Sequence, residues 1–111
     1  MKIEITKSRG VGIIKPDGKI TLGEGDIKLR EAVMNILDSG TINILVNLEN
    51  VVRIDSSGIG ELVSAYTTTN NRGGKLKLCC IPNKIIQILQ ITQLISVFEI
   101  YHEESEALAS F

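Results

Sequence analysis

Residues 42–63 read INILVNLENVVRIDSSGIGELV, and this stretch decides the fold. Its first half alternates apolar residues that would share one face of a strand: Ile42, Ile44, Val46 and Leu48. Leu45 makes the other face apolar as well, and a strand that is apolar on both faces belongs in the centre of a sheet. The second half has apolar residues at helical spacing, which continue to Tyr66: Ile59, Leu62, Val63 and Tyr66.

Towards the N-terminus the pattern predicts a hairpin and then a helix. Short apolar runs indicate strands at residues 2–6, 11–14 and 19–22, and Pro16-Asp17-Gly18 indicates a turn or bulge. Asp26 is a suitable N-cap for a first helix. The apolar face of that helix follows at i, i+4, i+7 and i+8, before Ser39-Gly40 ends it: Leu29, Val33, Ile36 and Leu37.

Towards the C-terminus strands and helices alternate. Gly73-Gly74 is expected to end the second helix, with positive φ. Residues 75–80 then alternate as a strand, with Leu76, Leu78 and Cys80 inward and Lys75, Lys77 and Cys79 outward. A third helix from Pro82, a strand over 97–101 and a helix over 103–109 complete the chain. This order predicts one α/β domain over residues 1–111, a mixed sheet with helices packed on it.

Composition excludes several classes of function. The 111 residues carry a net charge of -1 and include two Phe, two Tyr and no Trp, so neither a basic field nor stacking side chains favour nucleic-acid binding. No apolar window approaches the length of a membrane span or of a signal peptide. Cys79 and Cys80 are adjacent and should point to opposite strand faces, which makes a disulfide between them improbable. We expect a cytoplasmic monomer with reduced thiols.

Catalytic and cofactor motifs are missing. Phosphate-binding and dinucleotide-binding loops lack their required glycines, and neither Ser56 nor Ser57 lies in a nucleophile elbow. His102 is the only histidine, so we expect no metal or cofactor site built on histidine. Five carboxylates fall in predicted loops, where capping and solvation explain them: Asp17, Glu24, Asp26, Glu49 and Asp55.

Residues 53–60, RIDSSGIG, place hydroxyls where a strand ends and a helix begins. Free backbone N–H groups and the positive end of the helix dipole meet there, so a phosphate on a serine would be tolerated. Simple helix capping by Asp and Ser explains the same residues. From the segment alone, both interpretations stay open.

A longer segment, residues 47–82 (NLENVVRIDSSGIGELVSAYTTTNNRGGKLKLCCIP), resembles the anti-sigma factor antagonists of the STAS domain family. Residues 91–101, ITQLISVFEIY, resemble the ending of that family, and the likeness extends over roughly residues 10 to 110. The resemblance implies a STAS-type fold and a binding switch that is not an enzyme. It implies that Ser56 is phosphorylated by an anti-sigma factor that is also a serine kinase. The unphosphorylated form would bind this anti-sigma factor, which would then release its sigma factor. A PP2C-type phosphatase would reset the switch.

The resemblance also implies a partner-binding surface around Ser56. Its expected members are Asp55, Ser57, Gly58, Ile59, Glu61, Thr21, Glu24 and Asp26. One departure concerns residues 18–21, where Lys19 and Thr21 replace acidic residues that face the partner in similar proteins. Glu24 or Asp26 could supply the missing charge.

Two other functions stay open at this point. A non-switching STAS scaffold or adaptor, in a signalling or lipid-transport complex, would have the same fold without the kinase. A small hydrolase would use Ser56 as its nucleophile and would need a base, for which His102 is the single histidine.

Overall fold

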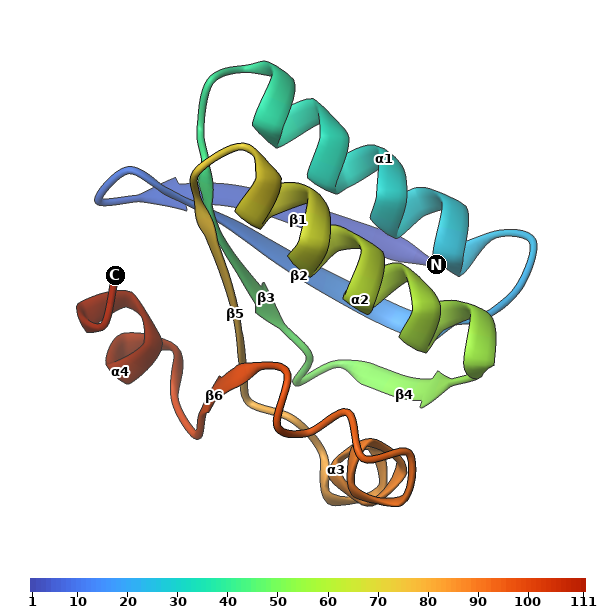
Figure 1. Cartoon of the computed structure of the whole chain (residues 1–111). Helices are drawn as coiled ribbons and strands as arrows, with labels where there is room; N and C mark the ends of the chain where they lie inside the picture. Colours follow the sequence, from blue (N-terminus) through green and yellow to red (C-terminus); the bar gives the residue numbers. More distant parts are fainter.

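The computed structural model describes residues 1–111 as a six-stranded mixed sheet with four helices (Figure 1). The strands are β1 (Lys2–Ser8), β2 (Val11–Ile20), β3 (Asn43–Asn47), β4 (Val51–Ile54), β5 (Lys75–Cys79) and β6 (Glu99–Tyr101). The helices are α1 (Gly25–Asp38), α2 (Ser56–Asn71), α3 (Asn83–Ile91) and α4 (Glu104–Ala109). The order β1-β2-β3-β5-β6, with only β1 antiparallel to its neighbour, confirms the predicted mixed sheet with a hairpin at one side.

Of the turn or bulge predicted at Pro16-Asp17-Gly18, the structure has the bulge, because β2 continues through it as one strand of 10 residues. Its beginning pairs with β3 and its end pairs with β4, and the register shifts between Gly18 and Lys19. Gly18 has a φ of 120°, so the expected special backbone is a bulge within the strand. Pro16 lies between these two pairings, where β1 is the strand's only neighbour. A proline is tolerated at such a position.

Strand β4 was not predicted as a strand separate from residues 42–48. Val51 and Ile54 are buried while Val52 and Arg53 between them are exposed, so the segment lacks the alternation that identifies a strand. Its pairing to the end of β2 defines it.

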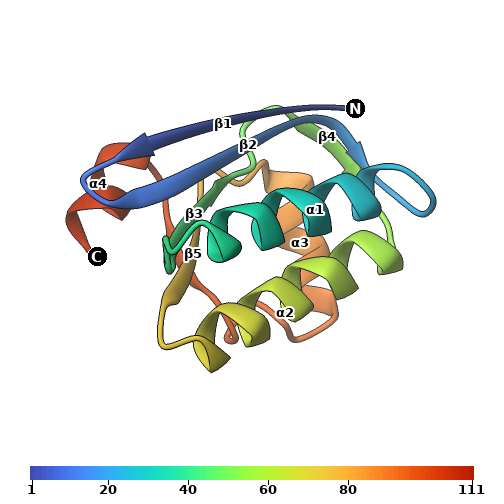
Figure 2. The ribbon, with the colours of Figure 1, turned by 90° about the horizontal axis from the view of Figure 1, so that it is seen from above.

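The main core lies between the sheet and the two long helices. Helices α1 and α2 lie side by side on one face of the sheet (Figure 2). The predicted apolar face of α1 is buried there with Ile59 and Leu62 of α2, while Val63 and Tyr66 of α2 are partly buried. Gly73 has the predicted positive φ, 83°, after α2. Gly74 is needed for another reason, since a Cβ on it would lie 1.7 Å from the Ile42 carbonyl oxygen.

The opposite face of the sheet is covered at one end by α4. A second apolar cluster forms there, consisting of Val11, Ile13, Leu45, Cys79 and Ala107. Lys77 and Cys79 were predicted on the outward face of the strand, but that face is covered by α4 and the C-terminal residues, which leaves the two side chains 2% and 0% exposed. The Lys77 ammonium donates hydrogen bonds to the carbonyl and hydroxyl oxygens of Ser110, at 2.8 and 2.9 Å.

Candidate functional site

The junction between β4 and α2 is held by the carboxylate of Asp55. Its Oδ1 accepts a hydrogen bond from the Gly58 N–H at 2.9 Å, which makes Asp55 the N-cap of α2 as the sequence predicts. Its Oδ2 accepts from the Leu22 N–H at 3.0 Å. The bonds from Gly58 and Leu22 hold the pKa of Asp55 below its ordinary value, so this carboxyl is ionised at neutral pH. One side chain thus ties the loop after β2 to the start of α2.

Ser56 is the first residue of α2, and its side chain is exposed. It lies directly after the Asp55 cap, at the end of the helix where backbone N–H groups are free of intrahelical partners. Ser57 is half-buried. Of the two hydroxyls, Ser56 is therefore the more accessible to another protein.

Two glycines bring both long helices against the end of β2. A Cβ on Gly58 would lie 2.1 Å from the carbonyl oxygen of Ile20, and a Cβ on Gly25 would lie 2.1 Å from that of Lys19. No other residue fits at either place without moving the backbone. The close approach predicted for Gly58 is confirmed, and it places the loop of residues 21–24 beside Ser56.

Exposed apolar side chains surround this junction. The exposed fraction is 75% for Leu22 and 56% for Val52. Val52 shares the rim of a shallow depression with Thr21 and Glu24, so β4 and the loop form one surface. We call Leu22, Val52, Thr21, Glu24 and Ser56 the junction surface. Large apolar side chains exposed together are typical of surfaces that bind another protein.

Three residues expected to contact a partner are mainly structural. Gly58 and Ile59 are buried, and Ile59 belongs to the main core. Asp26 is 6% exposed and lies inside the first turn of α1, so its prediction as the N-cap is wrong. The N-cap position is Glu24, without a side-chain bond. Asp26 instead accepts hydrogen bonds from the Gly23 and Ile27 N–H groups, which closes the loop.

The expected acidic residues are paired within the chain. Glu61 forms an ion pair with Arg30, and this pair links α2 to α1. Glu24 lies 3.0 Å from the Met1 ammonium and 3.5 Å from Lys28, and these cations lower its pKa. Lys19, the departure from the family pattern, lies in register with Arg53, and both are exposed. The flank of the junction surface is therefore basic where an acidic one was expected.

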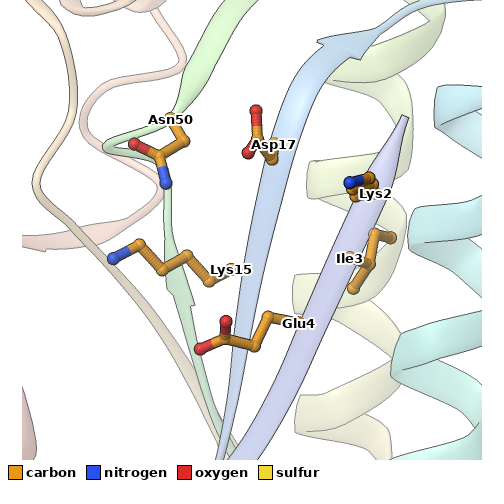
Figure 3. A pocket seen from close by; sticks show the side chains of 6 residues that line it. All are labelled: Lys2, Ile3, Glu4, Lys15, Asp17 and Asn50. Carbon is orange, nitrogen blue, oxygen red and sulfur yellow. The ribbon is translucent and has the colours of Figure 1, made fainter.

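A second concave area lies on the open face of β1 and β2 (Figure 3). It is lined by Lys2, Ile3, Glu4, Lys15, Asp17 and Asn50. Its charges alternate in sign, and Lys15 also pairs with Glu49 at 3.1 Å, which raises the pKa of Lys15. Alternating charges on an edge hairpin keep other strands from pairing with it. The charges of this area are therefore explained by protection of the sheet edge. The junction surface is the better candidate for a functional site.

The single histidine is not positioned beside Ser56. His102 is exposed and follows β6, whereas Ser56 follows β4, which pairs with β2. Strands β3 and β5 lie between β2 and β6 in the sheet. No group of three or more His, Cys, Asp or Glu side chains is arranged to hold a metal ion. None of the helices is both long and apolar enough to span a bilayer.

Comparison with known proteins finds relatives that match nearly the whole chain. The anti-sigma F factor antagonist of Paenibacillus polymyxa is 27% identical over 108 residues, which are 97% of this chain and 92% of that protein. A crystal structure of a Thermotoga maritima protein, proposed to be an anti-sigma factor antagonist, matches with a TM-score of 0.89 at 25% identity, over 97% of this chain and 92% of that one.

The Bacillus protein SpoIIAA has the same fold. Its unphosphorylated and phosphorylated structures match with TM-scores of 0.74 and 0.76, at 16% and 18% identity. Each match covers 98% of this chain, and they cover 96% and 98% of the SpoIIAA chains. The model of the STAS domain family matches residues 2–107. The chain belongs to the STAS domain family.

Proposed function

We propose that this chain is an anti-sigma factor antagonist, a binding protein and not an enzyme, whose docking is switched off by a phosphate on Ser56. The observation that carries the proposal is the exposed Ser56 hydroxyl at the start of α2, directly after Asp55, whose carboxylate accepts a hydrogen bond from the N–H of the exposed Leu22. The name of the Paenibacillus polymyxa relative supports the same function.

The unphosphorylated junction surface is suited to docking. Leu22 and Val52 would lose their contact with water on binding, which favours association in proportion to the apolar area buried. Glu24 is already neutralised by its cationic neighbours. The basic pair of Lys19 and Arg53 would meet an acidic area of the partner, and such complementarity raises the association rate.

Phosphorylation would change the charge of this surface and leave the fold in place. A phosphate adds about 1.5 to 2 negative charges at neutral pH, next to the ionised Asp55. The start of α2 tolerates that charge because of its dipole and N–H groups. The partner, however, would have to desolvate the phosphate when it docks. A loss of about 3 kcal/mol weakens binding more than a hundredfold.

This mechanism defines the partners. The binding partner is an anti-sigma factor that is also a serine kinase and that phosphorylates Ser56. A PP2C-type phosphatase removes the phosphate and restores docking. In support, SpoIIAA has this fold both with and without its phosphate.

The decisive experiment uses the serine-kinase anti-sigma factor encoded in the same genome. After incubation with ATP, mass spectrometry should find the phosphate on Ser56, and Ser56→Ala should remain unmodified while Ser57→Ala is modified. In titration calorimetry Ser56→Ala should bind and Ser56→Asp should bind weakly, with thermal melts equal to wild type. Binding to this partner with no phosphorylation of the chain after incubation with ATP would favour the non-switching scaffold. A phosphate only on Ser57 would refute the assignment.

The docking surface can be tested separately. Leu22→Ser should lower the affinity for the same anti-sigma factor at least about tenfold, because a central apolar contact is lost. Ile91→Ser is the matched control, since Ile91 is 82% exposed but lies at the end of α3. Equal affinities for the two variants would place the contact elsewhere on the chain. Charge reversal at the exposed Lys19 should slow association with little change in the melting temperature, because it removes part of the basic flank that meets the acidic area of the partner.

A further inference from the structure

The sequence predicts that the adjacent cysteines Cys79 and Cys80 point to opposite faces of a strand, but in the structure they do not. Their sulfur atoms lie 3.2 Å apart. Strand β5 ends at Cys79, and Cys80 has a φ of 60°, so the alternation of a strand stops between them. The turn of the backbone brings both side chains to the same side. The argument that made a bond between these two thiols improbable, that they point to opposite faces of a strand, therefore does not hold.

The backbone conformation at Cys80 is held by its neighbours. The left-handed region is costly for a residue with a side chain and persists where the surroundings enforce it. The Cys80 N–H donates to the Tyr101 carbonyl oxygen at 3.0 Å. The Cys79 carbonyl oxygen accepts from the Leu48 N–H at 3.1 Å. The two thiols are thus fixed in contact between β3 and β6.

We propose that Cys79 and Cys80 form a redox modification site, which a low-molecular-weight disulfide converts reversibly to a bond between the two neighbouring sulfurs. The site lies in the cluster under α4, on the sheet face opposite α1 and α2. It is therefore separate from the junction surface, and its chemistry is independent of the phosphate on Ser56.

The exposure of the two thiols sets the order of the steps. Cys80 is half-buried, so its thiolate attacks one sulfur of the reagent, forms a mixed disulfide and releases one thiolate. Cys79 is fully buried, so reagents from solution do not reach it. Its sulfur then attacks the Cys80 sulfur, and its proton goes to the second departing thiolate. The dithiol is oxidised, and one reagent disulfide is reduced to two thiols.

The product is easily reduced. Neighbouring α-carbons are about 3.8 Å apart across a trans peptide. Ordinary disulfides join residues whose α-carbons are roughly 4.4 to 6.8 Å apart. The bond between Cys79 and Cys80 is therefore strained, and strained disulfides are the labile ones. It closes when oxidised low-molecular-weight disulfide accumulates and reopens when the reduced thiol returns.

The test treats the folded, reduced chain with oxidised glutathione and follows its mass. Wild type should lose the mass of two hydrogen atoms, without an adduct and without a dimer, and should regain them in reduced glutathione. Circular dichroism should stay that of the folded chain throughout. A stable glutathione adduct on wild type, a linked dimer, an unreacted chain or a loss of fold during closure would each overturn the proposal.

Two single variants separate the steps. Cys79→Ala leaves Cys80 without a resolving thiol and should accumulate one glutathione adduct. Cys80→Ala leaves only the buried thiol and should remain unmodified over the same time. An adduct on Cys80→Ala that forms as fast as on Cys79→Ala would show that Cys79 is open to solvent, which contradicts the proposed order. Thermal melts of both variants verify that each is folded during the reaction.

Discussion

Replacing Gly58 by alanine should destabilise the protein, although alanine is the better helix former. The added Cβ would lie 2.1 Å from the Ile20 carbonyl oxygen and 2.7 Å from Cγ1 of Ile54. Neither the strand backbone nor the packed isoleucine can move freely. The loss in free energy of unfolding should therefore lie at the upper end of the range for substitutions that overpack a core, about 3 kcal/mol. For a chain of this length about 1 kcal/mol corresponds to roughly 4 °C in melting temperature. Gly58→Ala should therefore melt about 12 °C below wild type.

Gly60 provides a matched control in the same helix. A Cβ on Gly60 would meet no atom within 4 Å, and its backbone is helical. Gly60→Ala should therefore stabilise the chain by about 0.5 to 1 kcal/mol, since it removes glycine's flexibility from a helix. The two substitutions are chemically identical but are expected to change stability in opposite directions.

The assay is thermal and urea unfolding of wild type and both variants, followed by circular dichroism. The result that would refute the reasoning is a Gly58→Ala variant that melts within a degree or so of wild type, because the start of α2 would then not be pressed against β2. A Gly60→Ala variant that loses as much as Gly58→Ala would attribute the loss to the helix backbone and not to the contact with Ile20.

The remaining predictions concern one buried hydroxyl and one carboxylate. Thr69 is fully buried and its hydroxyl has no hydrogen-bond partner, so Thr69→Val should raise the free energy of unfolding by about 1 kcal/mol. Thr67→Val, at an exposed position of the same helix, is the control and should leave the stability nearly unchanged. A lower melting temperature for Thr69→Val than for wild type would contradict this prediction. The N–H groups of Gly58 and Leu22 lower the pKa of Asp55, so its contribution is present above the ordinary value of 3.8 and is lost as the pH falls through the lowered pKa. The stability difference between wild type and Asp55→Asn, from urea unfolding, should therefore shrink below about pH 4, and a constant difference would exclude the ionised carboxylate as the acceptor.

Local patterns in the sequence were sufficient to predict the structure of the junction between β4 and α2. The Asp55 cap, the start of α2 beside Ser56 and the close approach at Gly58 all follow from short patterns whose physics is local. The pairing of β3, β5 and β6 follows from the alternation of strands and helices, since such units pair in parallel.

The contacts that depend on distant segments could not be predicted. Whether Lys77 faces solvent depends on α4, which covers that face with residues more than twenty positions later in the chain. Strand β4 exists because the end of β2 passes beside it. The contact of the two cysteine sulfurs depends on a single left-handed residue, Cys80, which no pattern of residue types identifies. The position of the loop at Leu22 likewise depends on the hydrogen bond between its N–H and Asp55, 33 residues later in the chain.

The pairing of β2 with three strands also bears on how the chain folds. β1 reaches it through the two-residue turn at Arg9-Gly10, whereas β3 and β4 join it only after the whole of α1 has intervened. Closing a longer loop costs more chain entropy, and pairing between distant segments slows folding. We infer that the hairpin is the one part of the sheet that can assemble locally. Its free edge then serves as the template on which the parallel strands are added, and this addition sets the folding rate.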